Sequence, residues 1–282
     1  MENVSWRCGL FCVAAVCSLA ACESLGRGYW LSKYDGDIRR ANLSLQTAHD
    51  NRQRAAAYTR RGSAYAEKAR YSRSLKLISA AEYGRLFDLA VQDHDRAVQL
   101  APGNAEAYFS RGETYYGRAA SVAQDDMEPK SKAQDWYHLA IADFTHAIQC
   151  NGRHSQAFDM RGLIYEQAGD YDQAINDFTE EAGLSPKIGR LRLADAHCLR
   201  AGVYQGRKEY DLAIADYEKA IEFGVPSDSC DCDPYGPLAW VYFDGTHQYD
   251  KSWEVVHRAQ AARRWIPPEL LGGLKRASGR DR

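Results

Sequence analysis

One pattern of charged, small and aromatic residues recurs along the chain. The frame Arg-Gly-x-x-Tyr begins at Arg61, Arg111 and Arg161, in steps of 50 residues, and a variant, Arg-Ala-Gly-Val-Tyr, begins at Arg200. After each frame comes a second segment in which an alanine, a ring and another alanine follow one another at spacings of three or four residues. Such spacings place side chains on one face of a helix. Each frame with its following segment therefore predicts a hairpin of two helices.

The third copy of this pattern resembles the tetratricopeptide repeat (TPR) most closely. Its matching residues are Phe158, Gly162, Tyr165, Ala174, Phe178, Ala182 and Pro186. The resemblance covers roughly residues 55–264. It implies an all-α fold, a TPR solenoid of stacked antiparallel helix hairpins that winds as a right-handed superhelix. We expect repeats at 55–102, 105–152, 155–188 and 194–226, a linker and capping helix over 22–54, and a degenerate fifth repeat with a capping tail over 227–282.

The first two repeats are longer than the next two. The small residue of the first helix and the alanine of the second have the same spacing in repeats three and four, from Gly162 to Ala174 and from Ala201 to Ala213. This spacing is wider in repeats one and two, so each of these holds 16 extra residues. We expect both helices of each long hairpin to extend by about two turns. In the fifth repeat Trp240 falls at the small-residue position.

The arginine of each frame has an aspartate at a constant place in the second helix. The spacing between them grows by the insertion length in the two long repeats, so both keep their repeat register. We expect an ion pair between the two helices of each hairpin. The four pairs are Arg61 with Asp93, Arg111 with Asp143, Arg161 with Asp177, and Arg200 with Asp216. The alternative is a ladder of arginines that binds anions.

The N-terminus has an export pattern. Cys8 to Ala21 is an uncharged run of fourteen residues, the length of a signal-peptide apolar region and too short to span a bilayer. It ends in Leu-Ala-Ala-Cys, which resembles the bacterial lipobox, so residues 1–21 are expected to be a lipoprotein signal peptide and Cys22 the acylated residue. Glu23 after that cysteine implies lipid anchoring at the periplasmic face of the outer membrane. An ordinary cleaved signal is the alternative.

The cysteines agree with an oxidising compartment. Cys150, Cys198, Cys230 and Cys232 remain after the signal segment and the acylated residue. A disulfide of Cys198 with Cys230 or Cys232 is plausible, because the loop that leaves repeat four returns to the end where Cys198 lies.

The resemblance implies that a protein partner binds in the concave groove lined by the first helices. The groove positions are Glu106, Phe109, Glu113, Tyr116, Asp159, Glu166, Gln167, Asp195 and Gln205. Their acidic and aromatic character favours a partner segment that is basic and apolar. The alternative is that these side chains are only the solvated faces of helices.

No enzyme signature occurs: there is no Gly-rich phosphate loop, nucleophile elbow or set of metal ligands. We therefore expect a scaffold or adaptor of the cell envelope that is not an enzyme and needs no cofactor or metal. A net charge of −2 argues against nucleic acid as a partner. The alternatives are a soluble secreted TPR protein, or an envelope enzyme or its regulatory subunit with a site in the inserted segments 66–88 and 116–138.

Overall fold

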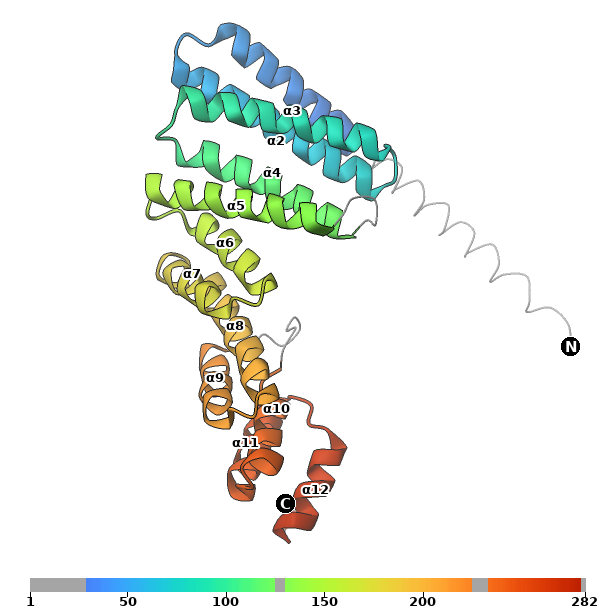
Figure 1. Cartoon of the computed structure of the whole chain (residues 1–282), viewed down its shortest axis with the longest axis vertical. Coiled ribbons are helices and arrows are strands. Elements are labelled where there is room, and N and C mark those ends of the chain that lie inside the picture. The colour runs from blue at the N-terminus through green and yellow to red at the C-terminus, as the bar shows by residue number, and fades with distance from the viewer. Residues whose placement is uncertain (1–28, 125–129, 225–232, 280–282) are drawn as a thin grey trace, which may run out of the picture. The chain divides into compact units, whose positions relative to one another are not determined.

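The computed structural model describes residues 29–124, 130–224 and 233–279, which contain helices and turns and no strand. The chain divides into an N-terminal unit that ends at Gly152 and a C-terminal unit that begins at Arg153 (Figure 1). Several predicted features lie outside the described residues: the signal segment 1–21, the acylation site Cys22, and both Cys230 and Cys232.

The N-terminal unit consists of a helix over residues 29–47 and two long antiparallel hairpins (Figure 1). The hairpin helices are α2 (Asn51–Ser74), α3 (Ala80–Leu100), α4 (Ala105–Gln124) and α5 (Lys130–Cys150). Asp50 and Ser79 begin α2 and α3, because their side chains accept hydrogen bonds from the free backbone N–H groups of the first turn. The helix over 29–47 occupies the segment where the capping helix was expected.

The helices of the first two repeats are longer than those of the third, as the insertions predict. They contain 24, 21, 20 and 21 residues, whereas α6 (Ser155–Gln167) contains 13 and α7 (Tyr171–Leu184) contains 14. At 1.5 Å of rise per residue, seven more residues add roughly 10 Å, or two turns. The extra residues therefore extend the hairpins and do not form a separate domain.

The C-terminal unit is also built from helices that follow one another as hairpins (Figure 1). After α6 and α7 come α8 (Pro186–Gly206), α9 (Tyr210–Phe223), α10 (Tyr235–Trp240), the π-helix η1 (Val241–Gly245), α11 (Tyr249–Ala261) and α12 (Pro268–Ser278). Residues 189–193, which lie between the expected repeats three and four, are helical and belong to α8. Proline has no backbone N–H to lose at the first helical position, so Pro186 begins α8 instead of following a helix as a terminator.

The small residue of each frame lies where the two helices of a hairpin cross. A Cβ atom on Gly112 would lie 2.8 Å from the ring of Phe144, and one on Gly162 would lie 2.5 Å from the ring of Phe178. Both rings are fully buried. A larger residue would push the helices apart or strain the core, so this position determines the spacing of each hairpin.

The two helices of the fifth repeat cross at a different residue from the one that the repeat pattern predicts. Trp240 is only partly buried, and the neighbouring Ala239 takes the place at the crossing, where its carbonyl accepts a hydrogen bond from Ser252 Oγ at 2.8 Å. The helix continues as η1, a π-helical segment of the kind that shifts the register of side chains. Leu270 and Leu274 of α12 are fully buried against this repeat, so α12 caps the C-terminal core.

Candidate functional site

Each repeated arginine forms a bidentate ion pair with the aspartate of its own hairpin: two guanidinium nitrogens contact the two carboxylate oxygens. Arg61 Nε and Nη2 both lie 2.7 Å from the Asp93 carboxylate, and Arg111 makes the same contacts with Asp143 at 2.8 and 2.7 Å. In the C-terminal unit the distances are 2.9 and 2.7 Å for Arg161 with Asp177, and 2.7 and 2.9 Å for Arg200 with Asp216. The four pairs expected from the repeat register are thus present.

A further contact joins three of these arginines to the preceding helix. Nη1 of Arg61 donates to Asn42 of the 29–47 helix at 2.7 Å, and Nη1 of Arg111 donates to Asp95 of α3 at 2.7 Å. Nη1 of Arg200 contacts Asp172 of α7. Each of these guanidinium groups therefore connects its own hairpin to the previous helix.

The electrostatics of the pairs fit a structural role. The hydrogen bonds that the four arginines donate to their partner aspartates raise the pKa of each arginine. Burial raises the pKa of Asp143 against the opposing effect of Arg111. Desolvation acts in the same direction on Asp216, but hydrogen bonds from Arg200 and His197 lower its pKa to about 2. With their hydrogen bonds taken by carboxylates, these arginines do not form an anion-binding ladder.

Phe109 does not face a groove, contrary to the prediction. It is buried, and its ring centroid lies 5.7 Å from that of Phe144 in the same hairpin. The long hairpin provides an extended interface between α4 and α5, and Phe109 fills part of it. Of the other groove positions on α4, Glu106 is exposed, whereas Glu113 and Tyr116 are half-buried and Tyr116 contacts the ring of Tyr137.

Some of the predicted groove residues in the C-terminal unit form hydrogen bonds with other side chains of the same chain. Asp159 of α6 accepts a hydrogen bond from Arg192 of α8 at 2.8 Å, and Gln205 accepts one from the Tyr217 hydroxyl at 2.8 Å. These two side chains stabilise helix packing. Gln167 is exposed, and Glu166 and Asp195 are half-buried.

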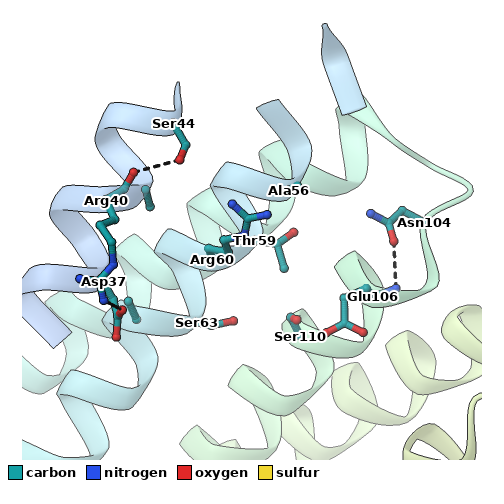
Figure 2. A pocket seen from close by; sticks show the side chains of 12 residues that line it. Asp37, Arg40, Ser44, Ala56, Thr59, Arg60, Ser63, Asn104, Glu106 and Ser110 are labelled. Carbon is teal, nitrogen blue, oxygen red and sulfur yellow. Dashed lines mark hydrogen bonds and ion pairs between the residues drawn. The ribbon is translucent and has the colours of Figure 1, made fainter. Parts of the chain in front are cut away.

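A pocket of about 630 Å³ opens in the N-terminal unit between the 29–47 helix, α2 and the start of α4 (Figure 2). Short side chains make up much of its lining, among them Ala41, Ser44, Ala56, Thr59, Ser63 and Ser110. Since α2 and α4 are the first helices of repeats one and two, the pocket lies on the helices where a groove was expected. Glu106 is the one predicted groove residue that lines it.

The charged groups of this pocket carry both signs (Figure 2). Arg40 is paired with Asp37, whereas Arg60 is exposed and has no ion-pair partner within the described residues. Asn104 accepts a hydrogen bond from the backbone N–H of Glu106 at 3.1 Å, which begins α4. The pocket therefore offers hydroxyl and amide groups, one available cation and one carboxylate. Sequence reasoning missed Arg60 and Asn104, because neither occupies a usual groove position.

Two buried titratable side chains lie outside the arginine pairs. His94 is fully buried opposite Gly62, neither ring nitrogen has a hydrogen-bond partner in the described part of the chain, and burial lowers its pKa to about 3. Glu181 of α7 is 1% exposed, and burial raises its pKa to about 7, with the charge of Asp159 adding to the effect.

The described residues contain no group of three or more His, Cys, Asp or Glu side chains placed to hold a metal ion. None of the helices in these residues is long and apolar enough to cross a membrane. Cys150 is free and exposed, and Cys198 is disulfide-bonded. Its partner therefore lies outside the described residues, and pairing with Cys230 or Cys232 stays a prediction.

Comparison with known proteins identifies repeats in the C-terminal unit. The tetratricopeptide repeat family model matches residues 155–187 and 194–223. The small glutamine-rich tetratricopeptide repeat-containing protein 2 of Mycosarcoma maydis is 30% identical over 86 residues, which are 30% of this chain and 23% of that protein. The match thus spans less than a quarter of the relative's length.

Several solved structures are similar to the chain at low sequence identity. MamA is 20% identical, with 68% of this chain and 89% of that chain covered and a TM-score of 0.40. TTC0263 of Thermus thermophilus is 19% identical, with 80% and 93% covered and a TM-score of 0.39. BtubC of P. vanneervenii is 13% identical, with 86% and 94% covered and a TM-score of 0.45. From its helical hairpins and the two repeats that the family model matches, the chain is an all-α protein that contains tetratricopeptide repeats.

Proposed function

We propose that this protein is a non-enzymatic scaffold that binds an extended segment of a protein partner in the pocket of Figure 2. The observation that carries the proposal is the pocket itself, which opens on the first helices of two adjacent repeats and is lined by short side chains. Small residues leave room for a main chain to approach, while hydroxyl and amide groups can hydrogen-bond it. Such a lining is better suited to binding than to acid–base chemistry.

The charges in the pocket define the partner further. Arg60, which has no ion-pair partner in the described residues, provides a place for an acidic group. A partner segment that carries an acidic group is therefore favoured over a purely apolar one.

Cross-linking in the native envelope tests this binding mode. A photo-reactive residue at Ser63 is expected to capture a defined partner, whereas the same residue at the exposed position of Arg96 on α3 serves as the matched control. Arg60→Glu should reduce the Ser63 cross-link at least several-fold without changing the helix content. Equal capture at both positions, or capture at Ser63 that Arg60→Glu leaves unchanged, would contradict the proposal.

We place the scaffold at the periplasmic face of the bacterial outer membrane, anchored through acyl chains on Cys22. The support is the apolar run that ends in Leu-Ala-Ala-Cys, and more than one acyl chain would hold a protein firmly at a bilayer. Metabolic labelling with palmitate should mark the wild type and not Cys22→Ser, and only the wild type should fractionate with outer membranes. Equal labelling of both, or recovery of the wild type in the soluble fraction, would refute the anchor.

A further inference from the structure

A smaller pocket of about 380 Å³ adjoins the pocket of Figure 2 in the N-terminal unit. Ser44, Ala56 and Arg60 line both pockets, so the two join into one groove between the 29–47 helix and α2. The smaller pocket extends this groove to Arg52 and Gln53 in the first turn of α2. We call the joined pockets the α2 groove.

Two arginines of the α2 groove have no carboxylate to neutralise them. Arg52 and Arg60 are both exposed, and neither forms an ion pair within the described residues. Arg40, in contrast, lines the same groove and is paired with Asp37. No aspartate or glutamate lines the smaller pocket in the part of the chain that the structure describes. Arg52 and Arg60 are therefore the two cations that a ligand would meet at this end of the groove.

The start of α2 increases the positive potential beside Arg52. The free backbone N–H groups of a helix N-terminus act as about half a positive charge, and the first turn of α2 contains no acidic residue. Asp50, which caps the helix, offsets part of this potential, and its carboxylate already accepts a hydrogen bond from the backbone N–H of Gln53 at 2.7 Å. Two arginines and the helix end outweigh one aspartate, so this end of the groove attracts an anion.

The two walls of the smaller pocket differ in hydrogen-bonding character. On α2, the side-chain oxygen of Gln53 accepts a hydrogen bond from the backbone N–H of His49 at 2.9 Å, so its amide nitrogen remains to donate to a ligand beside Arg52. On the 29–47 helix, the hydroxyls of Ser44 and Thr47 donate to backbone carbonyls of their own helix at 3.0 and 3.1 Å. These hydroxyls can therefore only accept from a ligand. Donors face acceptors across the groove, which suits a peptide with main-chain N–H groups and acidic side chains.

The spacing of Arg52 and Arg60 also suits an extended peptide. Arg60 comes eight residues after Arg52, which is about 12 Å along the axis of α2. An extended peptide rises about 3.3 Å per residue, and its side chains alternate between two faces. Residues four apart therefore lie on the same face at a distance of about 13 Å. This distance matches the separation of the two arginines along α2.

We propose that the α2 groove binds an extended acidic segment of the protein partner, with one carboxylate on Arg60 and a second, four residues away, on Arg52. The inference rests on the partner binding proposed above and names the chemistry that is recognised there. A nucleic acid fits less well, because no aromatic side chain lines either pocket within the described residues and a base would have no ring on which to stack. Single exposed ion pairs are weak, so two in register provide the selectivity.

Fluorescence anisotropy of the purified protein with labelled peptides at low salt tests the two acidic subsites. The peptides consist of serine and threonine, which disfavour helix formation. One carries two glutamates four positions apart, two keep only one of these glutamates and have glutamine at the other position, and a fourth has glutamine at both. A fifth peptide carries two adjacent glutamates and so has the same net charge as the first. In the wild type we expect each glutamate to tighten binding about threefold and the spaced pair about tenfold over glutamine.

Arginine variants assign each glutamate to its subsite. Arg52→Gln should remove the effect of one glutamate and keep that of the other, and Arg60→Gln should do the reverse, with unchanged helix content. Arg54→Gln is the matched control, because Arg54 is an exposed cation of α2 that lines neither pocket. It should leave the differences among the peptides as they are. Equal binding of adjacent and spaced glutamates, equal effects of Arg52→Gln and Arg54→Gln, or no binding at millimolar concentration would each overturn the proposal.

The peptides and the Ser63 cross-link answer different questions. Capture of a defined partner at Ser63, together with peptides that do not distinguish Arg52 from Arg54, would leave the partner pocket standing and refute the acidic subsites. Peptides that assign one glutamate to Arg52 and the other to Arg60 would support the subsites even if Ser63 captured nothing. In that case only the partner binding proposed above would fail.

Discussion

His94 offers a direct test of how the hairpin crossing is stabilised. It occupies the place in repeat one that Phe144 and Phe178 occupy in repeats two and three, and its ring faces Gly62 in the same way. The imidazole is fully buried with no hydrogen-bond partner in the described residues. The substitution His94→Phe restores the ring of the other repeats. It should stabilise the protein, because it removes a buried polar group that pairs with nothing.

The magnitude follows from the pKa of His94. Burial lowers this pKa from 6.5 to about 3, and the charge of Arg111 contributes in the same direction. As the pH falls below 6.5, the His94 imidazole becomes protonated in the unfolded chain but stays neutral in the folded chain. The free energy of unfolding therefore decreases. At pH 5 the unfolded imidazole is 1.5 pH units below its pKa, and at 1.36 kcal/mol per unit the loss is about 2 kcal/mol. The loss continues until the pH reaches the folded pKa.

Urea denaturation of wild type and His94→Phe at pH 7.5 and pH 5.0 measures the difference. At pH 7.5 we expect the free energy of unfolding of His94→Phe to exceed that of the wild type by about 1–3 kcal/mol, because the variant lacks the unsatisfied imidazole. This difference in the free energy of unfolding should be about 2 kcal/mol larger at pH 5.0. Hydrogen exchange of peptides from α3 should show that the effect arises in the N-terminal unit.

The reciprocal variant is the matched control. Phe178→His places an imidazole opposite Gly162 in the C-terminal unit and should introduce the same acid sensitivity there. If the difference between wild type and His94→Phe changes by less than about 0.5 kcal/mol across this pH range, the reasoning is wrong. In that case the imidazole finds a partner or water in solution.

Three further substitutions test the C-terminal unit by denaturation. Arg161→Ala leaves the buried Asp177 carboxylate unpaired and should cost about 3–5 kcal/mol, whereas the double variant Arg161→Met with Asp177→Leu should recover most of it. Gly189→Ala should destabilise, because the new Cβ would lie 2.3 Å from a backbone nitrogen of α7; its control Gly183→Ala, which meets no atom within 4 Å, should be neutral or stabilising. Glu181→Gln should match wild type at pH 5 and exceed it at pH 8, because a folded pKa raised to about 7 costs stability as the pH rises above 4.5.

The hairpins and their ion pairs could be predicted from the sequence because repetition reveals register. Arg111 and Asp143 are twice as far apart along the chain as Arg161 and Asp177, yet both members of each pair stay at fixed places in their helices. A change in spacing equal to the insertion length shows that two residues belong to different helices of one hairpin. The lengthened helices followed from the same comparison.

The side chains that line the pocket of Figure 2, and some contacts of the long helices, could not be predicted in this way. The first pocket depends on Arg40 and Asp37, which lie in a helix with no repeat against which to align them. The place of the Arg70 side chain depends on which residue of α4 it faces, and only the packing of the long helices shows that this residue is Gly117. Phe109 shows the same difficulty, since its groove position was inferred from repeats with shorter hairpins.

The third hydrogen bond of the repeated arginines has a consequence for how the chain unfolds. Contacts such as Arg111 with Asp95 and Arg200 with Asp172 contribute to the coupling between neighbouring repeats, not to the intrinsic stability of one hairpin. In a linear array the coupling term decides whether repeats melt together or one at a time. The same guanidinium also pairs with the aspartate of its own hairpin. The intrinsic stability of the hairpin and its coupling to the neighbouring repeat therefore change together. A fluctuation that opens one hairpin therefore also weakens its neighbour's attachment, and within each unit adjacent repeats should lose their structure as one cooperative block.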